Sequence, residues 1–252
     1  MIRPSILVTG GAKRIGSIIA RAFAAAGWHV VIHYGQSREP AQQLANLLPG
    51  AETVQCDLAD GDAAEEMVCT LAQRLPDWRL LVNCAAVFRP DTADRLDPDV
   101  FAEAMAVNAA TPTRMTQAFL THGRAQGGRR VIDFLDQKLR NMNPDFFSYT
   151  MAKQAFAGAL QMQAMALKNS QDRIYGIAPG AMMASHDQQQ DEHEVSGRMN
   201  LLGRLTDPQE LADAALFLST GWLANGTTLF IDSGQHLLAQ PRDVLYLARG
   251  LT

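Results

Sequence analysis

The sequence predicts a doubly wound α/β fold with a seven-stranded parallel sheet and helices on both of its faces. Short apolar runs alternate with stretches of helical periodicity along the whole chain, which is the pattern of repeated βα units. The first apolar run leads into a glycine-rich turn and then into a helical stretch, as in sheets that bind a dinucleotide. The chain has 252 residues, of which 47% are hydrophobic, so we expect one domain over residues 1–252.

Each predicted strand is a short apolar run bounded by turn-forming or helical residues. The seven runs are Ser5–Thr9, Trp28–His33, Thr53–Cys56, Leu80–Asn83, Arg130–Leu135, Ile174–Ala178 and Thr228–Asp232. Helical periodicity predicts helices near residues 15–26, 40–48, 61–75, 97–122, 149–168 and 207–218. The alternation continues without a repeat, a low-complexity tract or a linker, so the architecture is that of a single Rossmann-like domain.

The composition describes a mildly acidic protein. The formal net charge is -4, the isoelectric point is near 5.8 and no run of basic residues occurs, which argues against nucleic acid or an anionic membrane as a partner. Cys56, Cys69 and Cys84 form no C-x-x-C pair, and an odd count without a secretory signal suits reduced thiols in the cytosol. No apolar span reaches the length of a membrane helix, so we expect a cytoplasmic protein without a membrane anchor.

The glycine-rich turn reads TGGAKRIG. A pyrophosphate at a helix N-terminus needs close approach of backbone N–H groups, which residues without a side chain permit. Gly10, Gly11 and Gly16 serve that purpose, while Lys13 and Arg14 add positive charge. We therefore predict that Gly10, Lys13, Arg14, Ile15 and Gly16 bind a dinucleotide, with a plain exposed loop position as the alternative for Arg14.

The end of the second strand predicts which dinucleotide is bound. A carboxylate there binds an NAD ribose, whereas the 2′-phosphate of NADP requires its absence and nearby hydrogen-bond donors. The stretch HVVIHYGQSREP has no acid before Glu39, and His33, Ser37 and Arg38 are available as donors with Lys13 across the turn. We therefore predict NADP(H). The alternative for His33 is a strand-end histidine bonded within the fold.

The reaction centre is predicted at Tyr149 and Lys153, which are four residues apart. On a helix this spacing places the phenol and the ammonium on one face. A nearby cation favours the phenolate and so lowers a tyrosine pKa from about 10 toward neutrality, where the phenol can give and recover a proton. An ordinary amphipathic helix would have the same spacing, but the dinucleotide turn earlier in the chain favours catalysis.

The glycine-rich turn, Tyr149 and Lys153 together resemble the short-chain dehydrogenase/reductase family over nearly all of the chain. Within that family, the motifs T-G-x-A-K-R-x-G and Y-T-M-A-K are similar to those of the pteridine and dihydromonapterin reductases. Arg14 replaces the middle glycine of the general family pattern T-G-x-x-x-G-x-G. The resemblance implies that Arg14 faces both the cofactor phosphates and a pterin, and the H-Y-x-x-S wording, which includes Tyr34, supports NADP(H).

The resemblance also assigns cofactor contacts to three further pairs of residues. The pairs are Asp57 with Leu58, Asn83 with Ala85, and Pro179 with Gly180. The first pair follows the third strand, where the family contacts the adenine, although an aspartate there could instead cap a helix. The second pair lies in the segment NCAA, which replaces the family's N-N-A-G and lets backbone approach the cofactor. The third pair matches the family's P-G beneath the nicotinamide, although turn chemistry alone would also explain it.

Asp136 predicts the class of substrate. It stands thirteen residues before Tyr149, where most members of the family have a serine that donates a hydrogen bond to a carbonyl oxygen. An ionised carboxylate only accepts hydrogen bonds and would repel the oxyanion formed from a ketone, whereas it would stabilise the cationic iminium of a C=N bond. Pteridine reductases also have aspartate here. The alternative is a turn role for Asp136, with Ser148 or another hydroxyl serving a carbonyl.

Two further roles follow from the resemblance. Phe88 stands where pteridine reductases have an aromatic residue that stacks on the flat substrate, and its alternative is a core position under a loop. Asn108 matches the asparagine that distorts the fourth helix and holds a water linked to Lys153, and its alternative is a neutral mid-helix residue. The predicted substrate-binding set is therefore Arg14, Phe88, Asp136 and Tyr149, and the predicted catalytic set is Asp136, Tyr149, Lys153 and Asn108.

The last part of the chain is expected to cover the site. Residues 181–200 are polar and irregular, as in a mobile substrate lid. His186 and His193 in this segment lack the spacing of a helical metal pair, so no metal site is predicted. The tail at residues 235–252 carries apolar residues that need a surface to cover, and similarity to tetrameric reductases implies a homotetramer.

The leading hypothesis is an NADPH-dependent reductase of a pterin C=N bond, with dihydromonapterin, dihydrobiopterin or dihydrofolate as substrate. One alternative is a carbonyl reductase of the same fold, against which Asp136 argues. The other is a non-catalytic NADP(H)-binding regulatory protein, against which the presence of Tyr149, Lys153 and Asn108 argues.

Overall fold

A computed structural model of the chain describes residues 2–185 and 188–251, and it confirms the predicted fold. Its centre is a seven-stranded parallel sheet with the order β3-β2-β1-β4-β5-β6-β7. The strands are β1 (Ser5–Val8), β2 (His29–Tyr34), β3 (Glu52–Gln55), β4 (Trp78–Asn83), β5 (Arg130–Phe134), β6 (Arg173–Pro179) and β7 (Thr228–Ile231). Each strand lies at an apolar run of the sequence. A parallel sheet covered on both faces buries its inner strands, whereas the edge strands β3 and β7 are only partly buried.

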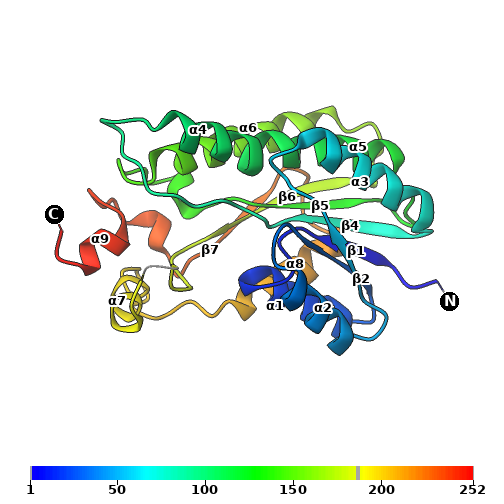
Figure 1. Cartoon of the computed structure of the whole chain (residues 1–252), viewed down its shortest axis with the longest axis horizontal. Coiled ribbons are helices and arrows are strands. Elements are labelled where there is room, and N and C mark those ends of the chain that lie inside the picture. Colours follow the sequence, from blue (N-terminus) through cyan, green and yellow to red (C-terminus); the bar gives the residue numbers. More distant parts are fainter. Residues whose placement is uncertain (1, 186–187, 252) are drawn as a thin grey trace.

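Helices cover both faces of the sheet (Figure 1). On one face lie α1 (Arg14–Ala25), α2 (Arg38–Leu47) and α8 (Gln209–Ser219). On the other lie α3 (Gly61–Arg74), α4 (Pro98–Met105), α5 (Thr111–His122) and α6 (Phe147–Ala166). Two short helices, α7 (Gln190–Ser196) and α9 (Val244–Ala248), contact each other at the end of the molecule away from the N-terminus. The remaining helical turns are η1 (Ala106–Ala110), η2 (Gln137–Leu139) and η3 (Gln235–Leu237).

The helix predicted over 97–122 is interrupted by η1, a π-helical segment that separates α4 from α5, in line with the distortion expected at Asn108. One expectation about helices is wrong. The lid predicted to be irregular contains α7, which begins with a capping box between Gln189 and Glu192. A helix of this length spans two turns, so it leaves little periodicity for a sequence pattern to detect.

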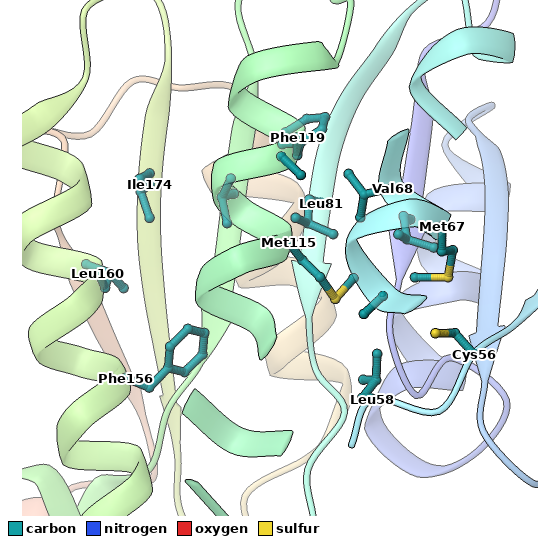
Figure 2. Packing of buried hydrophobic residues seen from close by; sticks show 14 of the residues in the cluster. Cys56, Leu58, Met67, Val68, Leu81, Met115, Phe119, Phe156, Leu160 and Ile174 are labelled. Atoms are coloured by element: carbon teal, nitrogen blue, oxygen red, sulfur yellow. The ribbon is translucent and has the colours of Figure 1, made fainter. Parts of the chain in front are cut away.

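The hydrophobic core has one layer on each face of the sheet. Figure 2 shows part of the layer beneath α3, α5 and α6, in which Met115 and Phe119 of α5 lie near Leu81 of β4 and Val68 of α3. Phe119 also contacts the fully buried Trp78, with ring centroids 4.6 Å apart. This packing fixes the strands against their helices, and therefore fixes the residues that follow each strand.

The strand order places a crevice at the carboxyl ends of the central strands. β1 and β4 are neighbours at the centre of the sheet. The chain adds β2 and β3 on the β1 side, and it adds β5, β6 and β7 on the β4 side. The connections after β1 and β4 therefore diverge to opposite faces, which opens a ligand-binding crevice at that point in such sheets. The glycine-rich turn follows β1, and Asp136 follows β5 at the same edge.

The C-terminal tail folds back onto its own chain. Val244 and Leu245 are each 6% exposed, and Leu245 packs in a small cluster with Phe146 and Tyr149. The expectation that these apolar residues need a neighbouring subunit to cover them is therefore wrong, and the homotetramer stays a prediction. In the part of the chain that the structure describes, no helix has the length and apolar character needed to cross a membrane.

Candidate active site

A cavity of about 540 Å³ opens at the carboxyl ends of the central strands. The predicted site residues that line it are Gly10, Lys13, Arg14, Ile15, Gly16, Ala85, Phe88, Asp136, Tyr149, Lys153, Pro179 and Gly180. The predicted site residues outside its lining are His33, Tyr34, Ser37, Arg38, Asp57, Leu58, Asn83 and Asn108. The structure thus brings the glycine-rich turn, the Tyr-Lys pair and the predicted substrate residues together in one cavity.

Tyr149 and Lys153 lie on the first turns of α6, as their spacing predicts. The Tyr149 hydroxyl donates a hydrogen bond to Asp136 Oδ2 at 2.9 Å, and Lys138 N donates to Asp136 Oδ1 at 2.8 Å. The Lys153 ammonium donates to the Phe134 carbonyl at 2.5 Å and lies 5.7 Å from the centroid of the Tyr149 ring. Asp136 is therefore both a turn residue, as its alternative predicted, and the direct hydrogen-bond partner of the phenol.

The electrostatics of this group differ from the prediction in one respect. Burial, followed by the negative charge of Asp136, raises the pKa of Tyr149 well above its usual value, so Lys153 does not bring it toward neutrality in this structure. Burial also raises the pKa of Asp136 and lowers the pKa of Lys153. The prediction failed because it counted the nearby cation without the desolvation of a phenol that is 8% exposed. The phenol is thus held in its protonated form, as a proton donor must be.

The turn after β1 fits a dinucleotide pyrophosphate. Among the described residues, no side chain caps the first N–H groups of α1, and no acid lies in the first turn of that helix. Gly10 has φ +62°, and a Cβ built on it would lie 3.0 Å from the Ala85 backbone. Free N–H groups at a helix start, with Lys13 and Arg14 exposed beside them, form an anion site. The residues present therefore fit the predicted group.

Arg14 carries a conformation that a non-glycine residue rarely adopts. Its φ is +50°, in the left-handed region, at the position where the wider family has glycine. Its Nη1 donates to the Ala184 carbonyl at 2.8 Å, so the side chain connects the phosphate turn with the segment that leads into α7. Such strain of about 1 kcal/mol is retained where the side chain has a role in the site.

His33 is not available to a 2′-phosphate, and that prediction is wrong. Its Nδ1 accepts a hydrogen bond from Gly10 N at 3.2 Å, and its Nε2 donates to the Cys56 carbonyl at 3.0 Å. The ring is 2% exposed, and this burial lowers its pKa to about 4, so it stays neutral. His33 holds the glycine-rich turn through its bond with Gly10 N. It is therefore a strand-end histidine bonded within the fold, which is the alternative given for it above. Tyr34 is likewise buried, in the core.

Ser37 and Arg38 remain the candidate phosphate ligands at this end of β2. Ser37 precedes α2 as its N-cap residue, yet its side chain makes no capping hydrogen bond within the described structure. Arg38 is exposed at the first position of that helix. A hydroxyl, a guanidinium and the N-terminus of a helix together favour a phosphate group.

Three predicted cofactor residues have structural roles instead of lining the cavity. Asp57 Oδ1 accepts from Ala59 N at 2.9 Å, as a turn residue does, and Leu58 packs in the core. Asn83 Nδ2 donates to Thr116 Oγ1 at 3.1 Å and to Asp133 Oδ1 at 2.8 Å, beneath the site. Because the Asn83 side chain is hydrogen-bonded within the fold, only the backbone of this residue is placed to approach a cofactor.

Asn108 interrupts its helix as predicted, while the water linked to Lys153 stays a prediction. The residue lies in η1, the π-helical segment. Its Oδ1 accepts from Val87 N and its Nδ2 donates to the Val87 carbonyl, both at 2.8 Å. The asparagine therefore fixes the backbone just before Phe88, and it acts on the site as a positioning residue.

Phe88 lies at the cavity with one face already covered. Its ring stacks on Phe146 with centroids 4.0 Å apart, and it meets the Tyr149 ring edge-on at 4.7 Å. Phe146 in turn stacks on Tyr246 of the tail, with centroids 5.8 Å apart. Phe88 is 37% exposed, so part of the ring remains open to a flat ligand.

Sequence patterns missed the cavity residues contributed by η2, the lid and the tail. They include Gln137, Lys138, Ser185, Gln188, Ser196, Gln235 and Asp243. Asp243 precedes an apolar run, which is a helix-capping signal, and it does cap α9 by accepting from Leu245 N. That signal predicts the helix but says nothing of where the helix docks.

No metal centre emerges from the described residues, which hold no group of three potential ligands. His193, one of the two lid histidines considered, is 7% exposed, and burial lowers its pKa. His186 lies outside the described residues.

Comparisons with known proteins agree with this geometry. The family model described as enoyl-(acyl carrier protein) reductase matches residues 10–236. Pteridine reductase 1 of Leishmania tarentolae is 28% identical, over 93% of this chain and 96% of that protein. The crystal structure of FolM alternative dihydrofolate reductase 1 from Brucella canis, complexed with NADP, is 30% identical and covers 96% of this chain and 97% of that one, with a TM-score of 0.89. The angucycline C-6 ketoreductase LanV with bound NADP is 26% identical, with a TM-score of 0.83 and coverage of 94% and 97%.

Proposed function

The chain belongs to the short-chain dehydrogenase/reductase family, and we propose that it is an NADPH-dependent reductase of a pterin C=N bond. Its substrates would be dihydropterins such as dihydromonapterin or dihydrobiopterin, or dihydrofolate, which it converts to the tetrahydro form. The glycine-rich turn and the donors at the start of α2 support NADP(H) as cofactor. The similarity to two NADP-bound reductases supports the same choice.

The observation that carries the proposal is the hydrogen bond from the Tyr149 hydroxyl to Asp136 Oδ2. A carboxylate at this position accepts hydrogen bonds, so it cannot stabilise the oxyanion that forms when a ketone is reduced. It can stabilise a ring nitrogen that gains a proton, and it can accept from the N–H groups of a pterin. The similarity to a pteridine reductase and to an alternative dihydrofolate reductase supports the same substrate class.

The chain's own residues hold and move the proton in this mechanism. NADPH, when bound, supplies the hydride to a carbon of the C=N bond. Tyr149, kept protonated by burial and by Asp136, gives its proton to the nitrogen. Lys153 would bind the nicotinamide ribose, and Phe88 would hold the flat ring at the cavity wall. Asp136 would stabilise the positive charge that develops on the substrate, and the Tyr149 phenolate would take up one proton from solvent, by way of Asp136, before the next turnover.

A substrate panel tests the proposal. We expect the purified protein to oxidise NADPH with dihydropterins or dihydrofolate, and to have little activity with a matched panel of ketones and aldehydes. Absorbance at the NADPH band measures turnover in each case. Turnover of carbonyls alone would contradict the proposal and support the alternative of a carbonyl reductase. Absence of turnover with every compound would instead support a non-catalytic NADP(H)-binding protein.

Cofactor preference gives a second prediction. Replacing Arg38 with alanine removes a cation from the expected 2′-phosphate site, so KM for NADPH should rise by about tenfold while KM for NADH stays nearly constant. Arg21→Ala, which removes an exposed arginine from the body of α1, is the matched control. Steady-state kinetics with both cofactors measure the effect. Equal rises for NADPH and NADH would place Arg38 elsewhere than at the 2′-phosphate.

A further inference from the structure

The C-terminal tail contributes a charged residue to the cavity. Asp243, Val244 and Leu245 all line it, and Asp243 is 9% exposed. The carboxylate of Asp243 lies 2.5 Å from the Lys138 ammonium, measured from Oδ2 to Nζ. Lys138 is also a cavity residue and is 4% exposed, so the pair forms a nearly dry part of the wall. The catalytic proposal does not use this pair.

The ammonium of Lys138 is already occupied by protein groups. Besides the Asp243 carboxylate, it donates to the Asp145 carbonyl at 3.3 Å, and it lies 5.0 Å from the centroid of the Phe146 ring. Two of the three N–H bonds of the ammonium thus have protein acceptors, and one of these acceptors is the Asp243 carboxylate. The cation therefore neutralises the tail carboxylate.

The two carboxylates on either side of Lys138 keep acceptor capacity. Asp243 Oδ1 accepts from Leu245 N at 3.0 Å, while its Oδ2 faces Lys138. Asp136 likewise accepts one hydrogen bond on each oxygen, from Lys138 N and from the Tyr149 hydroxyl. A carboxylate has about four acceptor positions, so each of these groups can accept further hydrogen bonds from a ligand in the cavity.

We propose that Asp243 is a substrate-binding residue which, together with Asp136, accepts hydrogen bonds from N–H or O–H groups of the substrate. The inference rests on the proposed pterin reductase function and extends it to specificity. A wall with two carboxylates, whose neighbouring cation is already paired, selects ligands rich in donors and rejects ligands that present acceptors or a negative charge to it. The donors could be the ring N–H and amino groups or the hydroxyls of a side chain on the ring.

The tail is anchored firmly enough to hold Asp243 in place. Arg242 forms an ion pair with the buried Asp145, with Nε 2.8 Å from Oδ2, and Asp243 N donates to that same oxygen at 2.8 Å. Farther along, Arg249 pairs with Glu192 of α7 at 2.9 Å. These contacts fix the residues on both sides of Asp243, and a fixed acceptor binds its ligand at a lower entropic cost than a mobile one.

Asp243→Asn tests the proposal because asparagine can still cap α9 and keeps the size of the side chain. We expect KM for a dihydropterin to rise by about tenfold or more with a much smaller change in kcat, since the variant loses a buried acceptor but keeps the proton donor. Asp97→Asn is the matched control, because it makes the same change at a helix-capping aspartate that does not line the cavity. The double variant Lys138→Gln/Asp243→Asn removes the ion pair as a whole and so leaves no unpaired buried ammonium.

Two substrates identify the donor groups. A larger loss with dihydromonapterin than with 6-methyl-7,8-dihydropterin, which lacks side-chain hydroxyls, would assign the contact to the hydroxyls. An equal loss with both would assign it to the ring. Either result must also occur in the double variant, and NADPH titration with a melting curve confirms that each variant is folded.

Unchanged KM values in Asp243→Asn, or equal losses in Asp97→Asn, would overturn the role of Asp243 while the unaltered protein still turns over dihydropterins. If the unaltered protein neither binds nor reduces a dihydropterin, the proposed function itself fails, and this inference fails with it. The two failures are therefore distinguished by the behaviour of the unaltered protein.

Discussion

Tyr149→Phe should lower turnover of a dihydropterin by about 100- to 10,000-fold, which is the usual contribution of a positioned proton donor. The substitution removes the hydroxyl that donates to Asp136 Oδ2. It leaves the aromatic ring, and with it the contacts to Phe88 and to the cluster with Phe146 and Leu245. NADPH binding should therefore stay nearly constant, as measured by fluorescence titration beside steady-state kinetics.

The tail offers a matched control for this result. Tyr246→Phe removes a hydroxyl from another ring of the same aromatic stack, but Tyr246 does not line the cavity. We expect that variant to retain most of the turnover. Retained turnover in Tyr149→Phe would exclude Tyr149 as the proton donor and would direct attention to Asp136, whose pKa is also raised by burial.

Asp133→Asn should stabilise the protein at alkaline pH by about 2 to 4 kcal/mol. Asp133 is fully buried, and burial raises the pKa of its carboxyl to about 7. Its Oδ1 accepts from Asn83 Nδ2, whereas its Oδ2 and Asn83 Oδ1 have no partner among the described residues. A proton on Asp133 supplies the donor that this pair lacks, and an asparagine amide would supply one at every pH.

The sign of the pH dependence follows from proton uptake. Between about pH 4 and pH 7 the folded protein holds a proton on Asp133 that the unfolded chain has released, so this contribution to stability is lost as pH rises through that window. The gain from Asp133→Asn should thus be largest at pH 8 and shrink toward pH 5. The positive charge of Lys153 lowers the pKa of Asp133 and so opposes the effect of burial. Asp133→Asn loses this attraction between the carboxylate and Lys153.

Urea unfolding of both proteins between pH 5 and pH 8 measures this difference. The same comparison in an Asn83→Ala background is a useful second test. Asn83→Ala removes the partner amide, so Asp133→Asn should then no longer raise the free energy of unfolding. A gain that does not vary with pH, or a loss at pH 8, would mean that Asp133 is already ionised in the folded protein at pH 5, which contradicts the raised pKa.

The features that sequence predicted well are those set by local geometry. Apolar runs predict the strands because a parallel sheet buries both faces of its inner strands. The i,i+4 spacing predicts the pairing of Tyr149 with Lys153 because it fixes a common helix face. His33 was assigned wrongly for a related reason. In a strand buried on both faces, alternation does not reveal whether a terminal residue points inward.

The features that sequence could not supply depend on contacts between distant segments. Asp243 reaches Lys138 only because the tail crosses the open end of the sheet, and no local pattern encodes that docking. The pKa of Tyr149 likewise depends on desolvation by the whole fold, which outweighs the neighbouring cation that the motif makes visible. Motifs therefore identified the reacting groups, and the assembled chain was needed to learn their charge state and their surroundings.

The residues for proton transfer and the proposed residue for substrate binding come from separate segments of the chain, and this separation has an evolutionary consequence. The groups assigned to proton transfer come from the end of β5 and the start of α6, whereas Asp243 comes from the short tail that follows β7. A duplicated copy of this gene could therefore change in the codons for residues 240–251 and acquire a new ligand preference while its chemical step stays intact. Paralogues that diverge first in their C-terminal segments would be the genomic record of such a history.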